Sequence, residues 1–113
     1  MSETLFQKII ERKLPATILY EDDQLICIND KFPLAKVHIL VIVKKVVPSI
    51  HEMRGEDLQL LPHIFQVIQQ LAIEHGIADN YRVITNRGVD AGQSIFHLHF
   101  HLLGGEKLGS KAG

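Results

Sequence analysis

His97-Leu98-His99-Phe100-His101-Leu102-Leu103, near the C-terminus, alternates imidazole with apolar side chains. Successive side chains of a β-strand point to opposite faces of the sheet. The pattern therefore predicts a strand with the three histidines on one face and Leu98, Phe100 and Leu102 on the other. Imidazole can act as a base, an acid, a nucleophile or a metal ligand near neutral pH. The histidine face is the predicted chemical site.

The composition predicts one globular domain. The chain has 113 residues, enough for one hydrophobic core and too few for two. Its formal net charge of −1 gives no long-range field that would favour nucleic acid or an anionic membrane as a partner. It has no run of about 18 apolar residues and no basic segment of a secretory signal. We expect one domain over residues 1–113, with a core at 14–106 and a short polar tail at 107–113.

Cys27 is the only cysteine, and it lies within the apolar run of residues 25–28. A single cysteine excludes an internal disulfide framework and a zinc ribbon. We interpret Cys27 as a small buried hydrophobe, and we expect a reducing, cytoplasmic location.

The remaining periodicity predicts an α+β domain. Helices are expected at 4–13 and 56–75, and Pro62 predicts a kink or a later start in the second helix. Strands are expected at 17–20, 25–28, 37–43, 81–85 and 95–103. Short turns between successive strands favour a five-stranded antiparallel sheet with the helices packed on its apolar side. That packing would leave the histidine face open as the floor of a substrate site.

A zinc site is the rival interpretation of the three histidines, because imidazoles two residues apart on a strand can ligate zinc. Against zinc, the stretch offers no nearby Asp, Glu or Cys that would orient the rings from a second layer. The residues therefore favour a site with no metal and no other cofactor. The other histidines show no such alternation, and we expect His51 and His63 to be solvated.

The triad and its flanks resemble a known family. His97 to Leu103 is similar to the histidine triad (HIT) motif, His-x-His-x-His-x-x with apolar x. Gly92-Gln93-Ser94 upstream and Gly104-Gly105 downstream resemble the Hint branch of that family, the purine nucleoside phosphoramidases. Residues 28–30 resemble its ribose-binding loop, and residues 37–42 its strand with a fourth histidine. The resemblance covers about residues 14–106.

The resemblance implies a hydrolase that cleaves the P–N bond of nucleoside 5′-phosphoramidates of the AMP-amine or AMP-lysine type. His99 matches the nucleophile, which forms a covalent nucleotidyl-histidine before water releases the monophosphate. The family orients this ring through the backbone carbonyl of the first triad histidine, here His97. His101 would lie beside the phosphate and the leaving group, and His38 would complete the polar cluster.

The resemblance also implies the nucleotide contacts and the assembly. Asp30 matches the acid that binds the ribose hydroxyls. Asn86, Gly92, Gln93 and Ser94 match positions around the phosphate and the leaving group, together with His99 and His101. The implied ligand is a purine nucleoside monophosphate or phosphoramidate. The implied assembly is a homodimer that joins residues 56–85 of two copies into one continuous sheet.

Two other functions stay open from the sequence. One is a non-catalytic nucleotide-binding or zinc-binding module that acts through protein partners. The intact His99 favours an enzyme, because a pure binder has no need of a nucleophile. The other is a hydrolase of dinucleoside polyphosphates, which the sister branch of the family represents. The Gly104-Gly105 ending and the Gly-Gln-Ser segment favour the phosphoramidase over this hydrolase.

Overall fold

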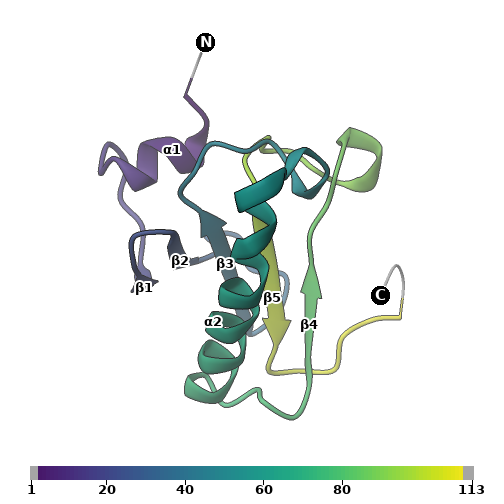
Figure 1. Cartoon of the computed structure of the whole chain (residues 1–113). Helices are drawn as coiled ribbons and strands as arrows, with labels where there is room; N and C mark the ends of the chain where they lie inside the picture. The colour runs from purple at the N-terminus through teal and green to yellow at the C-terminus, as the bar shows by residue number, and fades with distance from the viewer. Residues whose placement is uncertain (1–2, 111–113) are drawn as a thin grey trace.

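The sheet of the computed structural model has five antiparallel strands in the order β1-β2-β3-β5-β4, and the structure describes residues 3–110 (Figure 1). The strands are Ile18–Glu21 (β1), Leu25–Asn29 (β2), Val37–Val43 (β3), Tyr81–Ile84 (β4) and His99–Gly104 (β5). The helices are Leu5–Ile10 (α1) and Leu61–Glu74 (α2), with three short 3-10 helices at Ile50–Glu52 (η1), Gly55–Leu60 (η2) and Val89–Ala91 (η3). The predicted five-stranded antiparallel sheet is confirmed.

The central strands β2 and β3 are apolar along almost their whole length, and both of their faces are buried. Cys27 and Val41 belong to the core on one face of the sheet. Ile26, Leu40 and Ile42 belong to a second apolar cluster on the other face. Continuous apolar strands are typical of a sheet that is covered on both sides.

α2 covers the first of these faces. Its buried residues Ile64, Ile68 and Leu71 lie in the same core as Leu98 and Phe100. The helix begins at Leu61 after the 3-10 helix η2, with Pro62 in its first turn. Proline suits a first helical turn because its missing N–H has no partner there in any case. The prediction of a later start at Pro62 is thus confirmed.

α1 covers the opposite face, which carries the histidines, so the prediction that both helices pack on the apolar side is wrong. Phe6 and Ile9 of α1 are buried in the second cluster with Ile42. Thr4 caps this helix by accepting a hydrogen bond from the backbone N–H of Gln7 at 3.1 Å. Helices on both faces leave the histidines only partly open.

β5 begins at His99, four residues later than the predicted strand start at residue 95. Its pairing with β3 extends only to Ile42, opposite His99. Beyond that point the chain turns, and the backbone N–H of Leu98 donates to the carbonyl of Val47 at 2.7 Å instead. His97 therefore precedes the strand.

Asp22, in the turn between β1 and β2, ties this hairpin to α2. Its carboxylate accepts hydrogen bonds from the phenol of Tyr20 and from Nε2 of His63, each at 2.6 Å. Burial opposes ionisation of Asp22, but these bonds and two from backbone N–H groups outweigh it and lower its pKa to about 2. His63 is thus held by a hydrogen bond to Asp22 with its side chain 34% exposed, so it is less solvated than predicted.

The described part of the tail lies against the sheet. The carbonyl of Gly109 accepts a hydrogen bond from Arg82 of β4 at 2.8 Å, and Glu106 accepts one from the backbone of Lys36 at 2.6 Å. The end of the predicted polar tail, residues 111–113, lies outside the described residues. Among residues 3–110, no helix combines the length and the apolar character that spanning a bilayer requires.

Candidate active site

A cavity of about 770 Å³ opens over the histidine face of the sheet. Its volume lies within the range of pockets that hold small-molecule ligands, about 300–1,000 Å³. Apolar side chains form much of its wall, among them Leu5, Phe6 and Ile9 of α1, Leu14, Ile28 and Leu40. Its polar lining includes Asp30, Lys31, Ser94, His99 and His101.

His99 lines this cavity with one ring nitrogen fixed as a donor. Its Nδ1 lies 2.6 Å from the backbone carbonyl of His97, and only a protonated nitrogen can donate to a carbonyl. The neutral ring therefore has its free lone pair on Nε2. The ring of Phe6 packs edge-on against His99, with the centroids 4.8 Å apart. His99 thus has the tautomer that nucleophilic attack requires.

His97 is fully buried and does not line the cavity, so it does not share the open face that the alternation predicts. Its Nε2 donates to the carbonyl of Val43 at 2.5 Å. Its Nδ1 lies 3.4 Å from the hydroxyl of Thr4, the cap of α1. His97 thus acts on the site indirectly, because its backbone carbonyl orients the ring of His99.

His38 and His101 form a second hydrogen-bonded pair. The backbone N–H of Leu34 donates to Nδ1 of His38 at 3.0 Å, so the neutral ring of His38 carries its proton on Nε2. That proton lies between Nε2 of His38 and Nδ1 of His101, which are 2.9 Å apart. Nδ1 of His101 is therefore the acceptor, and its Nε2–H remains to donate to a ligand in the cavity.

Burial keeps these four histidines neutral. Burial lowers the pKa values of His38, His97 and His99 below the ordinary histidine value of 6.5. Burial is also the first cause at His101, and the neighbouring His99 and His38 add to it, so the pKa of His101 falls to about 4. The donor and acceptor pattern described above consequently holds at neutral pH.

Asp30 lies at the edge of the cavity, half-buried. One carboxylate oxygen accepts a hydrogen bond from the backbone N–H of Phe32 at 2.8 Å, and the other lies 3.4 Å from Nε2 of His38. A carboxylate has about four acceptor sites, so acceptors remain for the hydroxyls of a ligand.

Asp30, His38 and His101 are the one group within residues 3–110 whose ligand atoms could surround a metal ion, all within 4.8 Å of one another. A histidine that binds a metal normally donates a hydrogen bond from its other ring nitrogen. Nδ1 of His38 instead faces the N–H of Leu34, which itself donates. The second nitrogen of His38 thus opposes metal binding at Nε2, and the donor set fits a hydrogen-bonded pair better than a metal site.

The glycine-containing loop after β4 brings Ser94 to the cavity. Gly92, at φ +104, closes a turn in which its N–H donates to Val89 and the N–H of Gln93 donates to Gly88. These two groups are therefore used within the loop. Neither the N–H nor the hydroxyl of Ser94 has a partner within the described residues, and Ser94 lines the cavity. Of the three residues predicted to bind an anion here, Ser94 is the one whose N–H and hydroxyl stay available to a ligand in the cavity.

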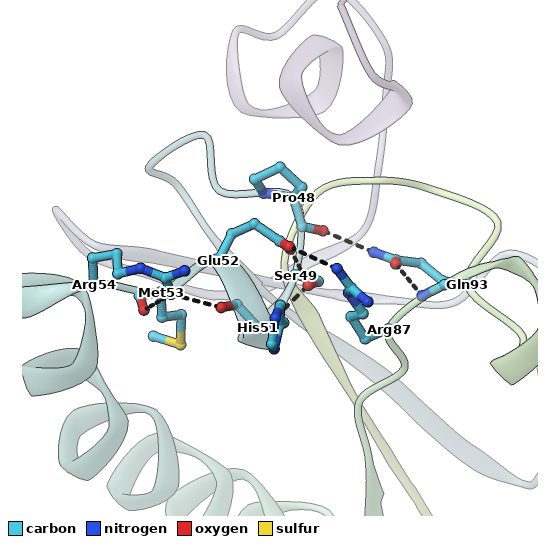
Figure 2. A network of polar contacts seen from close by, with 9 residues as sticks. Pro48, Ser49, His51, Glu52, Met53, Arg54, Arg87 and Gln93 are labelled. Atoms are coloured by element: carbon cyan, nitrogen blue, oxygen red, sulfur yellow. Dashed lines mark hydrogen bonds and ion pairs between the residues drawn. The ribbon is translucent and has the colours of Figure 1, made fainter.

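Two predicted nucleotide-binding residues of the same loop do not line the cavity. Asn86 is half-buried, and its side chain lies beside the α-carbon of Gly92, 3.6 Å from where a β-carbon of that residue would be. Gln93 is 4% exposed, and its side chain points to the backbone of Pro48 (Figure 2). The roles of the site residues stay predictions, but the structure brings Asp30, Gly92, Ser94, His99 and His101 to one cavity.

The structure adds a set of cavity residues that sequence reasoning missed. Leu5, Phe6 and Ile9 of α1 form part of the wall. The sequence feature that indicates them is the nearly continuous apolar character of β2 and β3, because such strands need packed elements on both faces of the sheet.

Comparisons with known proteins identify the family of the chain. A family model described as "Scavenger mRNA decapping enzyme C-term binding" matches residues 3–112. The chain is 43% identical to a HIT-like protein of Chlamydia pneumoniae over 109 residues, which are 96% of this chain and 99% of that protein. A HIT-like protein of Chlamydia trachomatis is 46% identical, with 96% and 98% covered.

Solved structures agree as well. A HIT family hydrolase from Clostridium thermocellum superposes with a TM-score of 0.93 at 45% identity, covering 99% of this chain and 98% of that one. A histidine triad protein from Clostridium difficile gives a TM-score of 0.90 at 39% identity, with 97% and 98% covered. This chain therefore belongs to the histidine triad family and shares the fold of HIT family hydrolases.

Proposed function

We propose that this protein hydrolyses the P–N bond of purine nucleoside 5′-phosphoramidates through a covalent nucleotidyl-histidine at His99. One observation carries the proposal above the others. The 2.6 Å bond from Nδ1 of His99 to the carbonyl of His97 leaves the lone pair of Nε2 free on a residue that lines the cavity. A nucleophilic imidazole needs this arrangement, and no separate base is required.

The reaction then proceeds in two displacements at phosphorus. Nε2 of His99 attacks the α-phosphorus, a P–N bond to His99 forms, and the P–N bond to the amine breaks. Water next attacks the same phosphorus, which frees His99 and releases the nucleoside monophosphate. Overall, the hydroxyl of water is added to phosphorus and its other proton goes to the amine, so every group of the site is regenerated.

The remaining cavity residues have matching tasks. The apolar wall from α1 suits a flat purine base, and Asp30 can accept hydrogen bonds from ribose hydroxyls. Ser94 offers an N–H and a hydroxyl to the phosphate, and His101 offers Nε2–H to the phosphate or the leaving nitrogen.

A fluorogenic adenosine 5′-phosphoramidate with an arylalkylamine leaving group tests the proposal. We expect release of the amine and AMP at the same rate with and without a chelator, because the proposed nucleophile is an imidazole lone pair. Added zinc should inhibit by occupying that lone pair. Activity that disappears with chelator and returns with stoichiometric zinc would overturn the mechanism.

A second candidate activity is hydrolysis of a phosphoanhydride in a dinucleoside polyphosphate. The family model favours it, because its description names a decapping enzyme. The same histidine nucleophile would serve, with a nucleotide in place of the amine as leaving group. Measuring kcat/KM for a dinucleoside polyphosphate beside the phosphoramidate separates the two activities.

We also propose a homodimer that forms through residues 56–85. This region exposes large apolar side chains that are unusual on a free surface, namely Leu58 (49% exposed), Phe65 (45%), Ile73 (63%) and Tyr81 (37%). β4 is an edge strand of the sheet, and an unpaired edge can extend a sheet into a second copy. We expect a single dimeric species in sedimentation equilibrium at micromolar concentration. Only monomer at that concentration would exclude the dimer.

A further inference from the structure

The side chain of Gln93 joins three backbone segments around the cavity loop (Figure 2). Its Nε2 donates to the carbonyl of Pro48 at 2.7 Å and to that of Ile95 at 3.3 Å. Its Oε1 accepts from the backbone N–H of Gly88 at 2.8 Å. Both N–H groups of the amide are thus used, and at 4% exposure the side chain is closed off from ligand.

These contacts fix the backbone on both sides of Ser94. Gly88 and Ile95 are the two ends of the turn, and Gln93 holds both of them as well as the neighbouring segment at Pro48. Ser94 lies between two residues that are held in this way, and it faces the cavity with its N–H and hydroxyl unpaired within residues 3–110.

A second contact, nearer the surface, also links the loop that contains Gly88 to the segment that follows Pro48 (Figure 2). Arg87 contacts the carboxylate of Glu52 at 3.3 Å, and the buried hydroxyl of Ser49 donates to the same carboxylate. The arginine side chain is more than half exposed, so this outer ion pair is screened by water and weak. The inner contacts of Gln93, which are buried, are therefore the stronger restraint on the loop.

We propose that Gln93 is a positioning residue that holds the N–H and hydroxyl of Ser94 toward the phosphate of the ligand, and that it does not touch the ligand itself. The proposal rests on the proposed nucleotide site. The three contacts of the side chain require an amide at position 93, because one contact needs an acceptor and two need donors. A carboxylate could still accept from Gly88, but it would face the carbonyls of Pro48 and Ile95 with no proton to donate.

The test compares binding of AMP with binding of adenosine, which lacks the phosphate. We expect Gln93→Met and Gln93→Glu to weaken AMP binding about tenfold, the effect of losing one hydrogen bond to a charged group. Adenosine binding should change by less than about twofold, because Gln93 does not reach the base or ribose region. Isothermal titration at neutral pH measures both affinities.

Gln70→Met is the matched control, because Gln70 lies on α2, is exposed, does not line the cavity and donates a hydrogen bond to Glu74. It should leave both affinities unchanged. Equal weakening of AMP and adenosine by the Gln93 variants would show general damage to the fold and overturn the proposal, and so would unchanged AMP binding. If the unaltered protein binds neither compound, the proposed nucleotide site itself fails, which is a different and recognisable result.

Discussion

His99→Ala is expected to lower kcat/KM for a nucleoside phosphoramidate by at least about 10⁴-fold, comparable with the loss of a covalent nucleophile in other hydrolases. The substitution removes the cavity imidazole whose Nε2 lone pair is kept free by the hydrogen bond from Nδ1 to the carbonyl of His97. The apolar face of β5 is untouched, so the fold should survive. Initial rates with the fluorogenic substrate measure the loss.

Two controls accompany this variant. His75→Ala removes a histidine at the end of α2, outside the cavity lining, and should keep full activity. Mass spectrometry of acid-quenched protein during turnover should show a nucleotidyl adduct on His99 in the unaltered chain and none in the alanine variant. Activity of His99→Ala near that of the unaltered protein would exclude His99 as the nucleophile.

The dependence of kcat/KM on pH tests the role of His99 independently of substitution. Protonation of Nε2 removes the attacking lone pair, so kcat/KM must fall as the pH drops through the pKa of His99. Burial lowers that pKa below 6.5, against the hydrogen bond to His97, which raises it. The acid limb of the profile should therefore lie below pH 6.5, and a limb above this value would contradict the neutral, buried ring.

The sequence was most informative where one periodicity dominated. The run of residues 37–43 predicts β3 with its observed bounds, because a short stretch rich in Val and Ile, interrupted only by His38 and bounded by turn residues, favours a buried strand. Pro62 marked the start of α2 for a local reason, the missing N–H of proline. The alternation at 97–103 correctly placed His99 and His101 on one face.

The position of His97 depended on tertiary contacts that periodicity does not contain. Its alternation with His99 predicts a shared open face, but the pairing of β3 with β5 ends at Ile42 and His99, which leaves His97 beyond the paired residues. There it is buried by α1 and bonded to Val43. The uninterrupted apolar sequences of β2 and β3 already required a cover on the histidine face, and α1 supplies it.

The loop residues were hardest to predict, because their roles depend on loop conformation. The family resemblance assigns Gly92, Gln93 and Ser94 together to the phosphate and the leaving group. The structure separates them: the N–H groups of Gly92 and Gln93 close the turn, and only Ser94 presents unpaired donors to the cavity within residues 3–110. No spacing rule distinguishes a glutamine that binds a ligand from one that binds its own loop.

His101→Ala should separate the attack at phosphorus from the departure of the leaving group. In the structure, His38 donates to Nδ1 of His101, which leaves Nε2–H as the donor toward the ligand. A hydrogen bond from this N–H stabilises the negative charge that develops on the leaving nitrogen, so losing the donor should lower kcat/KM for the phosphoramidate by about 10²-fold or more. His101→Gln, which keeps an N–H donor, should retain more activity than the alanine variant.

The matched substrate is a nucleoside 5′-phosphate ester of nitrophenol, whose leaving group departs as an anion and needs no proton. With this ester, we expect His101→Ala to lose less than about tenfold, since the attack by His99 remains intact. His99→Ala should fail with both substrates, because each reaction requires the nucleophile. An equal loss for ester and phosphoramidate in His101→Ala would exclude a role at the leaving group. It would instead assign His101 to binding the phosphate, which both substrates share.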